Sequence, residues 1–119
     1  MAEETVKPVG PYTPLVKAGP WLVVSGQVGI VNGAIVDGGL EAELRQAFAN
    51  LRGLLEAEGT TLDSVTKTTV FLLSMDDYAE MNRVYIDEFG DHRPARSAVA
   101  VKELPVGAQI EIEAWCYVG

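Results

Sequence analysis

The sequence predicts an α+β fold in which two helices cover one face of a β-sheet. Three observations predict it: apolar runs broken by turn residues in the first third, two segments with apolar residues at helical spacing, and a final stretch that alternates strictly. The chain has 119 residues, of which 48% are hydrophobic, which suffices for one domain with its own core. We therefore expect a single domain over residues 1–119, with a polar and loose segment at residues 1–9.

The first third predicts antiparallel strands. Residues 21–26 form an apolar run that ends at Gly26, where the missing side chain lets a ligand or another backbone come close. An Asn-Gly pair between apolar flanks predicts a hairpin over residues 28–36. Before these strands, Tyr12 stands between two prolines in a loop whose backbone is preset. The ring of Tyr12 either caps the core or gives a binding pocket a polar group.

The middle of the chain predicts two helices and a strand between them. Residues 40–58 predict an amphipathic helix with one buried face, and Gly59 follows at the position of a left-handed C-cap. Residues 65–73 are rich in β-branched and aromatic side chains and predict a strand. Ser74, with an aspartate three residues later, resembles a capping box that opens a helix running to about Phe89. The residues expected on the inner faces are Leu40, Leu44, Ala47, Phe48, Leu51, Leu54 and Leu55 in the first helix and Tyr78, Met81, Tyr85 and Phe89 in the second.

The stretch after the second helix contains an arginine that is a candidate ligand-binding residue. Pro94 suits the start of a strand because its missing N–H is no loss there, and alternation then puts Arg96, Ala98 and Ala100 on one face. A guanidinium beside two small side chains has space to bind a carboxylate through two parallel hydrogen bonds. The alternative is an arginine that simply extends into solvent. Asn82, on the preceding helix, is either a solvated edge residue or a polar group that reaches a neighbour.

The last strand, over residues 109–118, alternates between two kinds of side chain. Its two faces are Ile110, Ile112, Ala114, Cys116 and Val118 on one side and Gln109, Glu111, Glu113, Trp115 and Tyr117 on the other. The first set fits a core face under the helices, whereas the aromatic end of the second is too apolar to face water. A second copy of the chain is the simplest cover, so we expect a closed homo-oligomer with ligand pockets at its interfaces. Arg96 and Glu111 would then face a shared cleft.

Composition argues against several classes of function. Nine basic and 17 acidic residues give a net charge of −8, which argues against a nucleic-acid partner. One cysteine, Cys116, and one histidine, His92, are too few for a zinc site or a disulfide framework. His92 lies in a loop-like segment that predicts a solvated side chain. No phosphate-binding motif indicates a nucleotide cofactor, and no apolar run is long enough to cross a membrane. We therefore expect a cytoplasmic protein without a membrane partner.

Five stretches, taken in order, resemble one known family. They are Gly10-Pro11-Tyr12, Ser25-Gly26-Gln27, Lys67-Thr68-Thr69-Val70-Phe71, Pro94-Ala95-Arg96-Ser97 and Ile110-Glu111-Ile112-Glu113-Ala114. Their order resembles that of the Rid (YjgF/YER057c/UK114) family of reactive-intermediate deaminases. The resemblance implies a chorismate-mutase-like α+β domain with a mixed sheet, a homotrimer, and ligand sites at the subunit interfaces. It also implies cofactor-independent hydrolysis of enamines and imines of 2-oxo acids, such as 2-aminoacrylate, to the 2-oxo acid and ammonia.

The resemblance also implies residue roles. By position, these are the carboxylate clamp Arg96, the pocket tyrosine Tyr12, the backbone contact Gly26, the helix asparagine Asn82 and the last-strand acid Glu111. Arg96, Glu111 and Tyr12 would be catalytic, with Glu111 orienting or activating water. Arg96, Gly26, Asn82 and Ala98 would contact the substrate. Ala98 stands where the family often has a cysteine, so this position supplies no side-chain chemistry. Arg93 stands where the family often has an aromatic residue, and the first hairpin turn is shorter than in many members. These last two departures concern substrate shape more than reaction class.

Two functions therefore compete at this stage. One is the imine deaminase, which needs both Arg96 and Glu111. The other is a non-catalytic protein that binds small carboxylates such as 2-oxo acids in the same clefts, and it needs Arg96 alone. The ribonuclease activity that has been attached to the family suits neither the acidic charge nor the lack of a basic patch.

Overall fold

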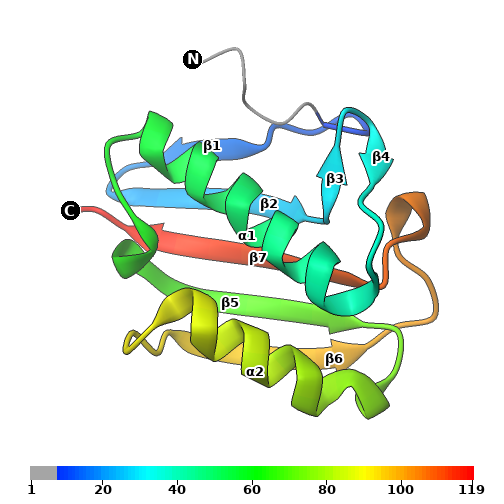
Figure 1. Ribbon diagram of the computed structural model, residues 1–119. Coiled ribbons are helices and arrows are strands. Elements are labelled where there is room, and N and C mark those ends of the chain that lie inside the picture. Colours follow the sequence, from blue (N-terminus) through cyan, green and yellow to red (C-terminus); the bar gives the residue numbers. More distant parts are fainter. Residues whose placement is uncertain (1–7) are drawn as a thin grey trace.

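The structure, a computed structural model, describes residues 8–119; the expectation of a loose segment at residues 1–9 falls mostly outside them. Helices α1 and α2 lie side by side on one face of a five-stranded sheet in the order β1-β2-β7-β5-β6 (Figure 1). The elements are β1 (Leu15–Ala18), β2 (Trp21–Gln27), β3 (Ile30–Val31), β4 (Ala34–Ile35), α1 (Gly39–Ala57), β5 (Val65–Leu72), α2 (Tyr78–Phe89), β6 (Ala95–Ala100) and β7 (Ile110–Tyr117). The predicted α+β arrangement, with both helices on one face, is confirmed.

The sheet is mixed, as the resemblance implies. Strands β5 and β6 are parallel, and the other neighbouring pairs are antiparallel. Helix α2 provides the crossover that two parallel strands require. Strand β1 was not predicted, because the four residues directly after Pro14 are mostly exposed and have no alternating pattern. In the small β3–β4 hairpin, Asn32 and Gly33 have φ values of 53° and 83°, which is the backbone that the Asn-Gly pair predicts.

The helices bury the faces that their spacing predicts, with one exception. All seven inner residues expected for α1 are buried, and Phe48 packs edge-on against Tyr85 and Phe89 with ring centroids 6.0 and 5.2 Å apart. In α2 the expectation for Tyr78 is wrong, since it is 39% exposed, whereas Val84 is fully buried. Tyr78 is the first residue of the helix, so its side chain lies at the rim of the layer instead of over its centre.

The predicted caps are present in modified form. Ser74 Oγ accepts a hydrogen bond from the Asp76 N–H at 3.0 Å, but it caps a 3₁₀ turn over Met75–Asp77 that leads into α2. Gly59 has a φ of 78° after α1, which is the left-handed conformation of a C-cap. The N–H of Thr60 donates to the Leu55 carbonyl at 3.1 Å. These bonds satisfy backbone groups that would otherwise lack partners at the helix ends.

The sheet face opposite the helices carries an aromatic cluster. Trp21 packs edge-on against Tyr117 and Trp115, with ring centroids 5.2 and 6.5 Å apart. Trp115 and Tyr117 are 46% and 49% exposed, as the alternation of β7 predicts. The strand ends at Tyr117, so Val118, expected in the core, is exposed instead. Whether a second subunit covers this face stays a prediction.

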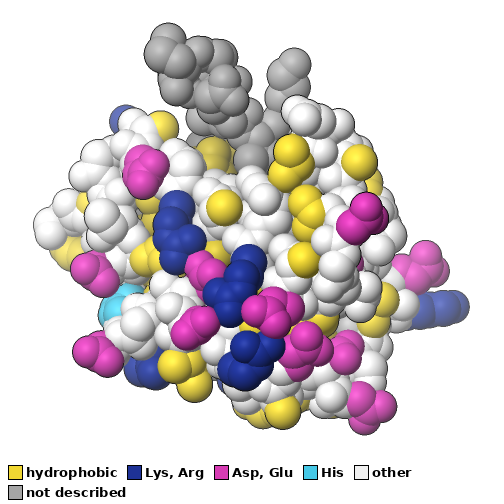
Figure 2. Space-filling model, in the orientation of Figure 1, with side chains coloured by type: hydrophobic (Ala, Val, Ile, Leu, Met, Phe, Trp, Pro, Cys, Tyr) yellow, Lys and Arg dark blue, Asp and Glu magenta, His cyan; other side chains and the backbone are white. Residues whose placement is uncertain are grey.

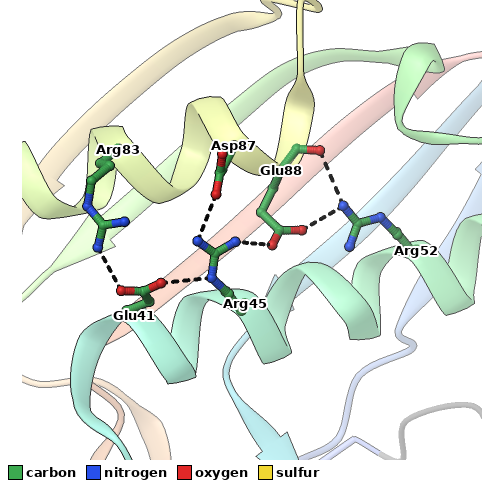
Figure 3. Close-up of polar contacts among 6 residues, drawn as sticks. All are labelled: Glu41, Arg45, Arg52, Arg83, Asp87 and Glu88. Carbon is green, nitrogen blue, oxygen red and sulfur yellow. Dashed lines mark hydrogen bonds and ion pairs between the residues drawn. The ribbon is translucent and has the colours of Figure 1, made fainter.

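Helices α1 and α2 are joined by a network of ion pairs (Figure 3). Arg45 stands at its centre and contacts three carboxylates, those of Glu41 at 3.0 Å, Asp87 at 2.9 Å and Glu88 at 2.8 Å. Hydrogen bonds to Asp87, Glu41 and Glu88 raise the pKa of the Arg45 guanidinium. On the helix-covered face the basic side chains alternate with acidic ones and form no continuous basic patch (Figure 2).

Candidate functional site

Arg96 lies on the edge strand β6, with its side chain on the helix-covered face. The register that pairs Arg96 with buried Thr68 on β5 fixes this orientation. The guanidinium is half-buried and reaches helix α2, where Nη1 donates to Asn82 Oδ1 at 2.8 Å and contacts Met81 Sδ at 3.5 Å. Asn82 is therefore a polar group that reaches a neighbour. The alternative prediction, that Asn82 is a solvated residue at the edge of the helix, is wrong.

Two tyrosines complete the surroundings of Arg96. Nη2 donates to the Tyr78 hydroxyl at 2.9 Å. The guanidinium carbon lies 4.9 Å from the ring centre of Tyr85 and 5.4 Å from that of Tyr78, within the range of cation–π attraction. Tyr85 is held in place by a 2.7 Å hydrogen bond to buried Thr68. Arg96 therefore has a fixed orientation, which reduces the entropy lost when it binds a ligand.

Among the five arginines of the chain, Arg96 has a distinct set of partners. Arg45, Arg52 and Arg83 pair with carboxylates of the helix network. Arg93 donates through Nη1 to the backbone carbonyls of Gly90 and, at 2.9 Å, of His92. The partners of Arg96 within residues 8–119 are neutral oxygens, a sulfur and aromatic rings. Its positive charge is thus not compensated by a carboxylate there, which favours an anionic ligand.

Of two residues near Arg96, Ala98 lies on the predicted face of the strand and His92 departs from its predicted environment. Ala98 lies on the same face as Arg96, opposite Val70, and packs against the core; its short side chain adds no polar group. His92 is half-buried, with Nε2 2.7 Å from the Val65 carbonyl oxygen and its ring edge-on to Phe89. The expectation of a solvated His92 is therefore wrong, because the loop folds back against Val65, the first residue of β5.

Glu111, Gly26 and Tyr12 line a separate pocket of about 190 Å³, on the face opposite the helices. Its other lining residues are Val9, Ser25, Val28 and Pro105. The Glu111 carboxylate lies so close to the Gly26 backbone that position 26 requires a glycine, since a Cβ built there would lie 1.7 Å from Glu111 Oε2. The Tyr12 hydroxyl accepts a hydrogen bond from the Val9 N–H at 3.2 Å. The sequence-predicted glycine, acid and tyrosine are thus brought together.

Burial raises the pKa of the Glu111 carboxyl above its ordinary value, and the nearby charge of Glu113 raises that pKa further. A carboxyl whose pKa moves toward neutrality is suited to accept and return a proton. Within the described residues, Glu111 makes no hydrogen bond or ion pair that would favour its charged form. The electrostatics of the pocket therefore match a proton shuttle.

This electrostatic arrangement predicts a pH-dependent stability. The folded state holds the Glu111 proton more tightly than the unfolded state, so wild-type stability falls as pH rises from the ordinary value of 4.5 through the raised pKa. Glu111→Gln has no such loss. We expect this variant to have a higher Tm than wild type at neutral pH, with the difference vanishing below pH 4.5. Thermal unfolding at matched pH values measures it. Glu103→Gln, at an exposed position, is the control, and an equal gain in both variants would contradict the assignment.

A second prediction concerns Gly26. In Gly26→Ala the new methyl group displaces the Glu111 carboxylate, which is the end of a flexible side chain. We expect the fold to survive with a change in stability of about 1 kcal/mol or less, while kcat/KM for the imine hydrolysis that the family resemblance implies falls by roughly tenfold or more because the acid is misplaced. Circular dichroism and kinetics test this. Gly53→Ala is the matched control, since a Cβ there meets nothing within 4 Å; equal activities of the two variants would refute the prediction.

The two groups of residues do not meet within one chain. Arg96 and Asn82 lie on the helix side of the sheet, whereas Glu111, Gly26 and Tyr12 lie on the other side. Strand β5 separates β6 from β7, so the strands that carry Arg96 and Glu111 are not neighbours. A cleft shared by Arg96 and Glu111 therefore requires residues from two chains.

Sequence reasoning missed the role of Tyr78, which it placed in the core. A signal was available: Tyr78 and Asn82 are four residues apart on one helix, so their side chains lie on the same face. Met81 was correctly placed in the core, but its sulfur also reaches Arg96. The described part of the chain holds no group of three or more His, Cys, Asp or Glu side chains arranged to bind a metal ion. It also has no helix that is both long and apolar enough to span a membrane.

Comparisons with known proteins define the class. The family model described as Endoribonuclease L-PSP matches residues 2–118. A RutC family protein of Pyrococcus horikoshii is 45% identical over 117 residues, covering 97% of this chain and 93% of that one. The mouse 2-iminobutanoate/2-iminopropanoate deaminase is 41% identical over 108 residues, covering 89% and 80%. The crystal structure of RidA from an Antarctic Psychrobacter superposes with a TM-score of 0.92 at 34% identity, covering 98% and 95%.

These matches span nearly the whole chain and agree with its sheet and helices. The fold is thus that of single-domain α+β proteins with two helices on one face of a mixed sheet. The chain belongs to the Rid (YjgF/YER057c/UK114) family. The names within this family refer to different activities. The mouse relative is named a deaminase, whereas the family description names an endoribonuclease.

Proposed function

We propose that this protein is a cofactor-independent deaminase that hydrolyses reactive enamine and imine forms of 2-oxo acids, such as 2-aminoacrylate, to the 2-oxo acid and ammonia. The observation that carries the proposal is Arg96, whose guanidinium is oriented by neutral partners and has no carboxylate within the described residues. Such an arginine binds a substrate carboxylate. The deaminase name of a 41% identical relative supports the same reaction.

The chemistry needs few groups. An enamine first gains a proton at carbon and becomes the imine. Protonation of the enamine at carbon leaves the nitrogen as an iminium group, and water adds to the iminium carbon while one water proton passes to the Glu111 carboxylate. Glu111 returns this proton to the amine nitrogen. The C–N bond then breaks with its electron pair on nitrogen, ammonia leaves, and the hydroxyl oxygen forms the C=O bond of the 2-oxo acid and releases its proton to solvent. Arg96 holds the carboxylate so that the reacting carbon stays beside the water, while Tyr12 and the Gly26 backbone shape the pocket. The proposal requires no metal or cofactor.

The proposed site forms between subunits of a closed homotrimer. One subunit supplies Arg96 with Asn82 and the space beside Ala98, and its neighbour supplies Glu111, Tyr12 and Gly26. The exposed aromatic cluster of Trp21, Trp115 and Tyr117 supports such an assembly, because an apolar face of this kind is commonly covered by a second copy. Sedimentation at micromolar concentration should give about three times the chain mass; a monomer would refute the assembly. The cytoplasm is the proposed location.

The decisive experiment generates 2-aminoacrylate in situ with a serine dehydratase. We expect wild-type protein to accelerate its conversion to pyruvate and ammonia, and Arg96→Ala to lack this effect. The alternative, a non-catalytic binder of 2-oxo acids, predicts Arg96-dependent binding without acceleration. Since the raised pKa of Glu111 suits proton transfer and a pure binder has no use for it, we favour the enzyme.

A further inference from the structure

Tyr78, which helical spacing predicted in the core, has no role in the reaction proposed above. It is the first residue of α2 and 39% exposed, and its hydroxyl accepts a hydrogen bond from Arg96 Nη2 at 2.9 Å. Asn82 and Met81 contact Nη1 of the same guanidinium at 2.8 and 3.5 Å. Two of the three contacts are made by Nη1 and one by Nη2, and this distribution determines which edge of the guanidinium is open.

An arginine has five N–H groups and can grip a carboxylate in two ways. The end-on grip uses one N–H from each terminal nitrogen, and the side-on grip uses Nε with Nη2. In this structure Nη1 already has two acceptors, Asn82 Oδ1 and Met81 Sδ. Within residues 8–119, Nε has no hydrogen-bond partner and Nη2 has only Tyr78. The side-on edge is therefore the one available for a bidentate ligand.

We propose that Tyr78 is a positioning residue that holds Arg96 so that the substrate carboxylate binds side-on, through Nε and Nη2. The inference rests on the proposed function, since it specifies how that site receives its 2-imino acid. Tyr78 acts through its hydroxyl, which fixes the rotation of the guanidinium about its long side chain. Its ring contact with Arg96, at 5.4 Å, does not need the hydroxyl, so Tyr78→Phe removes the orienting bond and keeps the packing.

The test measures binding of 2-oxobutanoate, a stable carboxylate of the product class, by calorimetry. We expect Tyr78→Phe to raise its Kd by roughly fivefold to tenfold, which is within the range for the loss of one hydrogen bond of ordinary strength. In kinetics KM should rise by a similar factor, with kcat within about a factor of two. Thr66→Val is the control: it also removes one side-chain hydroxyl, at an exposed position near the start of β5, and its Kd should equal that of wild type.

Nuclear magnetic resonance supplies an independent readout. The Nε–H signal of Arg96, assigned by its absence in Arg96→Lys, should shift on titration with 2-oxobutanoate. Binding without such a shift overturns the side-on grip. Arg96-dependent binding with equal Kd in wild type and Tyr78→Phe overturns the role of Tyr78 and leaves the proposed function intact. If 2-oxobutanoate does not bind wild type, or binds equally to Arg96→Ala, the proposed function fails and this inference with it.

Discussion

Replacing Arg96 by alanine is expected to lower kcat/KM for imine hydrolysis by about a hundredfold or more. Two hydrogen bonds to a charged carboxylate contribute roughly 1.5–3 kcal/mol each, and about 1.4 kcal/mol corresponds to a factor of ten. The loss should appear in both substrate binding and turnover, because the carboxylate grip also places the reacting carbon. The measurement is the steady-state rate of ammonia release from 2-aminoacrylate generated in situ.

Arg96→Lys separates the charge from the planar geometry. Lysine keeps a positive charge but cannot make two parallel hydrogen bonds, so we expect most of the activity loss to persist. Folding is not expected to explain the loss, since Arg96 is half-buried at the sheet edge and its partners Asn82 and Tyr78 are themselves partly exposed. A thermal unfolding curve for each variant checks this. If Arg96→Ala retained wild-type kcat/KM, the carboxylate clamp would be refuted.

Mixing two inactive variants is expected to restore activity. Arg96→Ala lacks the clamp and Glu111→Gln lacks the acid, and in the structure these two groups lie on opposite faces of the sheet. If each site takes Arg96 from one subunit and Glu111 from its neighbour, equal amounts assembled at random give intact sites at about a quarter of the interfaces. The expected activity is therefore roughly a quarter of wild type, measured after the two variants are refolded together.

The control for this experiment mixes Arg96→Ala with the double variant Arg96→Ala/Glu111→Gln. No pairing of these two chains contains an intact Arg96, so no activity should return. If the first mixture also stayed inactive although the chains had assembled together, the two-chain site would be wrong. Co-purification of differently tagged subunits shows whether they assembled.

Local patterns predicted most of the fold. The Asn-Gly pair, the glycine after α1 and the alternation of β7 each act over a few residues, and each had its predicted conformation. Strand β1 had no such pattern, because it is short and mostly exposed. It is a strand only because its backbone pairs with that of β2. Tyr78 was misplaced for a related reason, because helical spacing shows which residues share a face but not which of them lie beyond the rim of the sheet.

For the candidate site too, some features were predicted from the sequence and others were not. The sequence predicted which residues would carry the chemistry, because the roles proposed for Arg96, Glu111, Gly26 and Asn82 follow from the type and order of residues that the chain shares with the family. Only the tertiary structure decided their grouping. A strand's register sets the face that a side chain occupies, and the insertion of β5 between β6 and β7 separates Arg96 from Glu111. That arrangement arises from contacts between segments far apart in the chain, and it shows that a cleft shared by Arg96 and Glu111 cannot form within one chain.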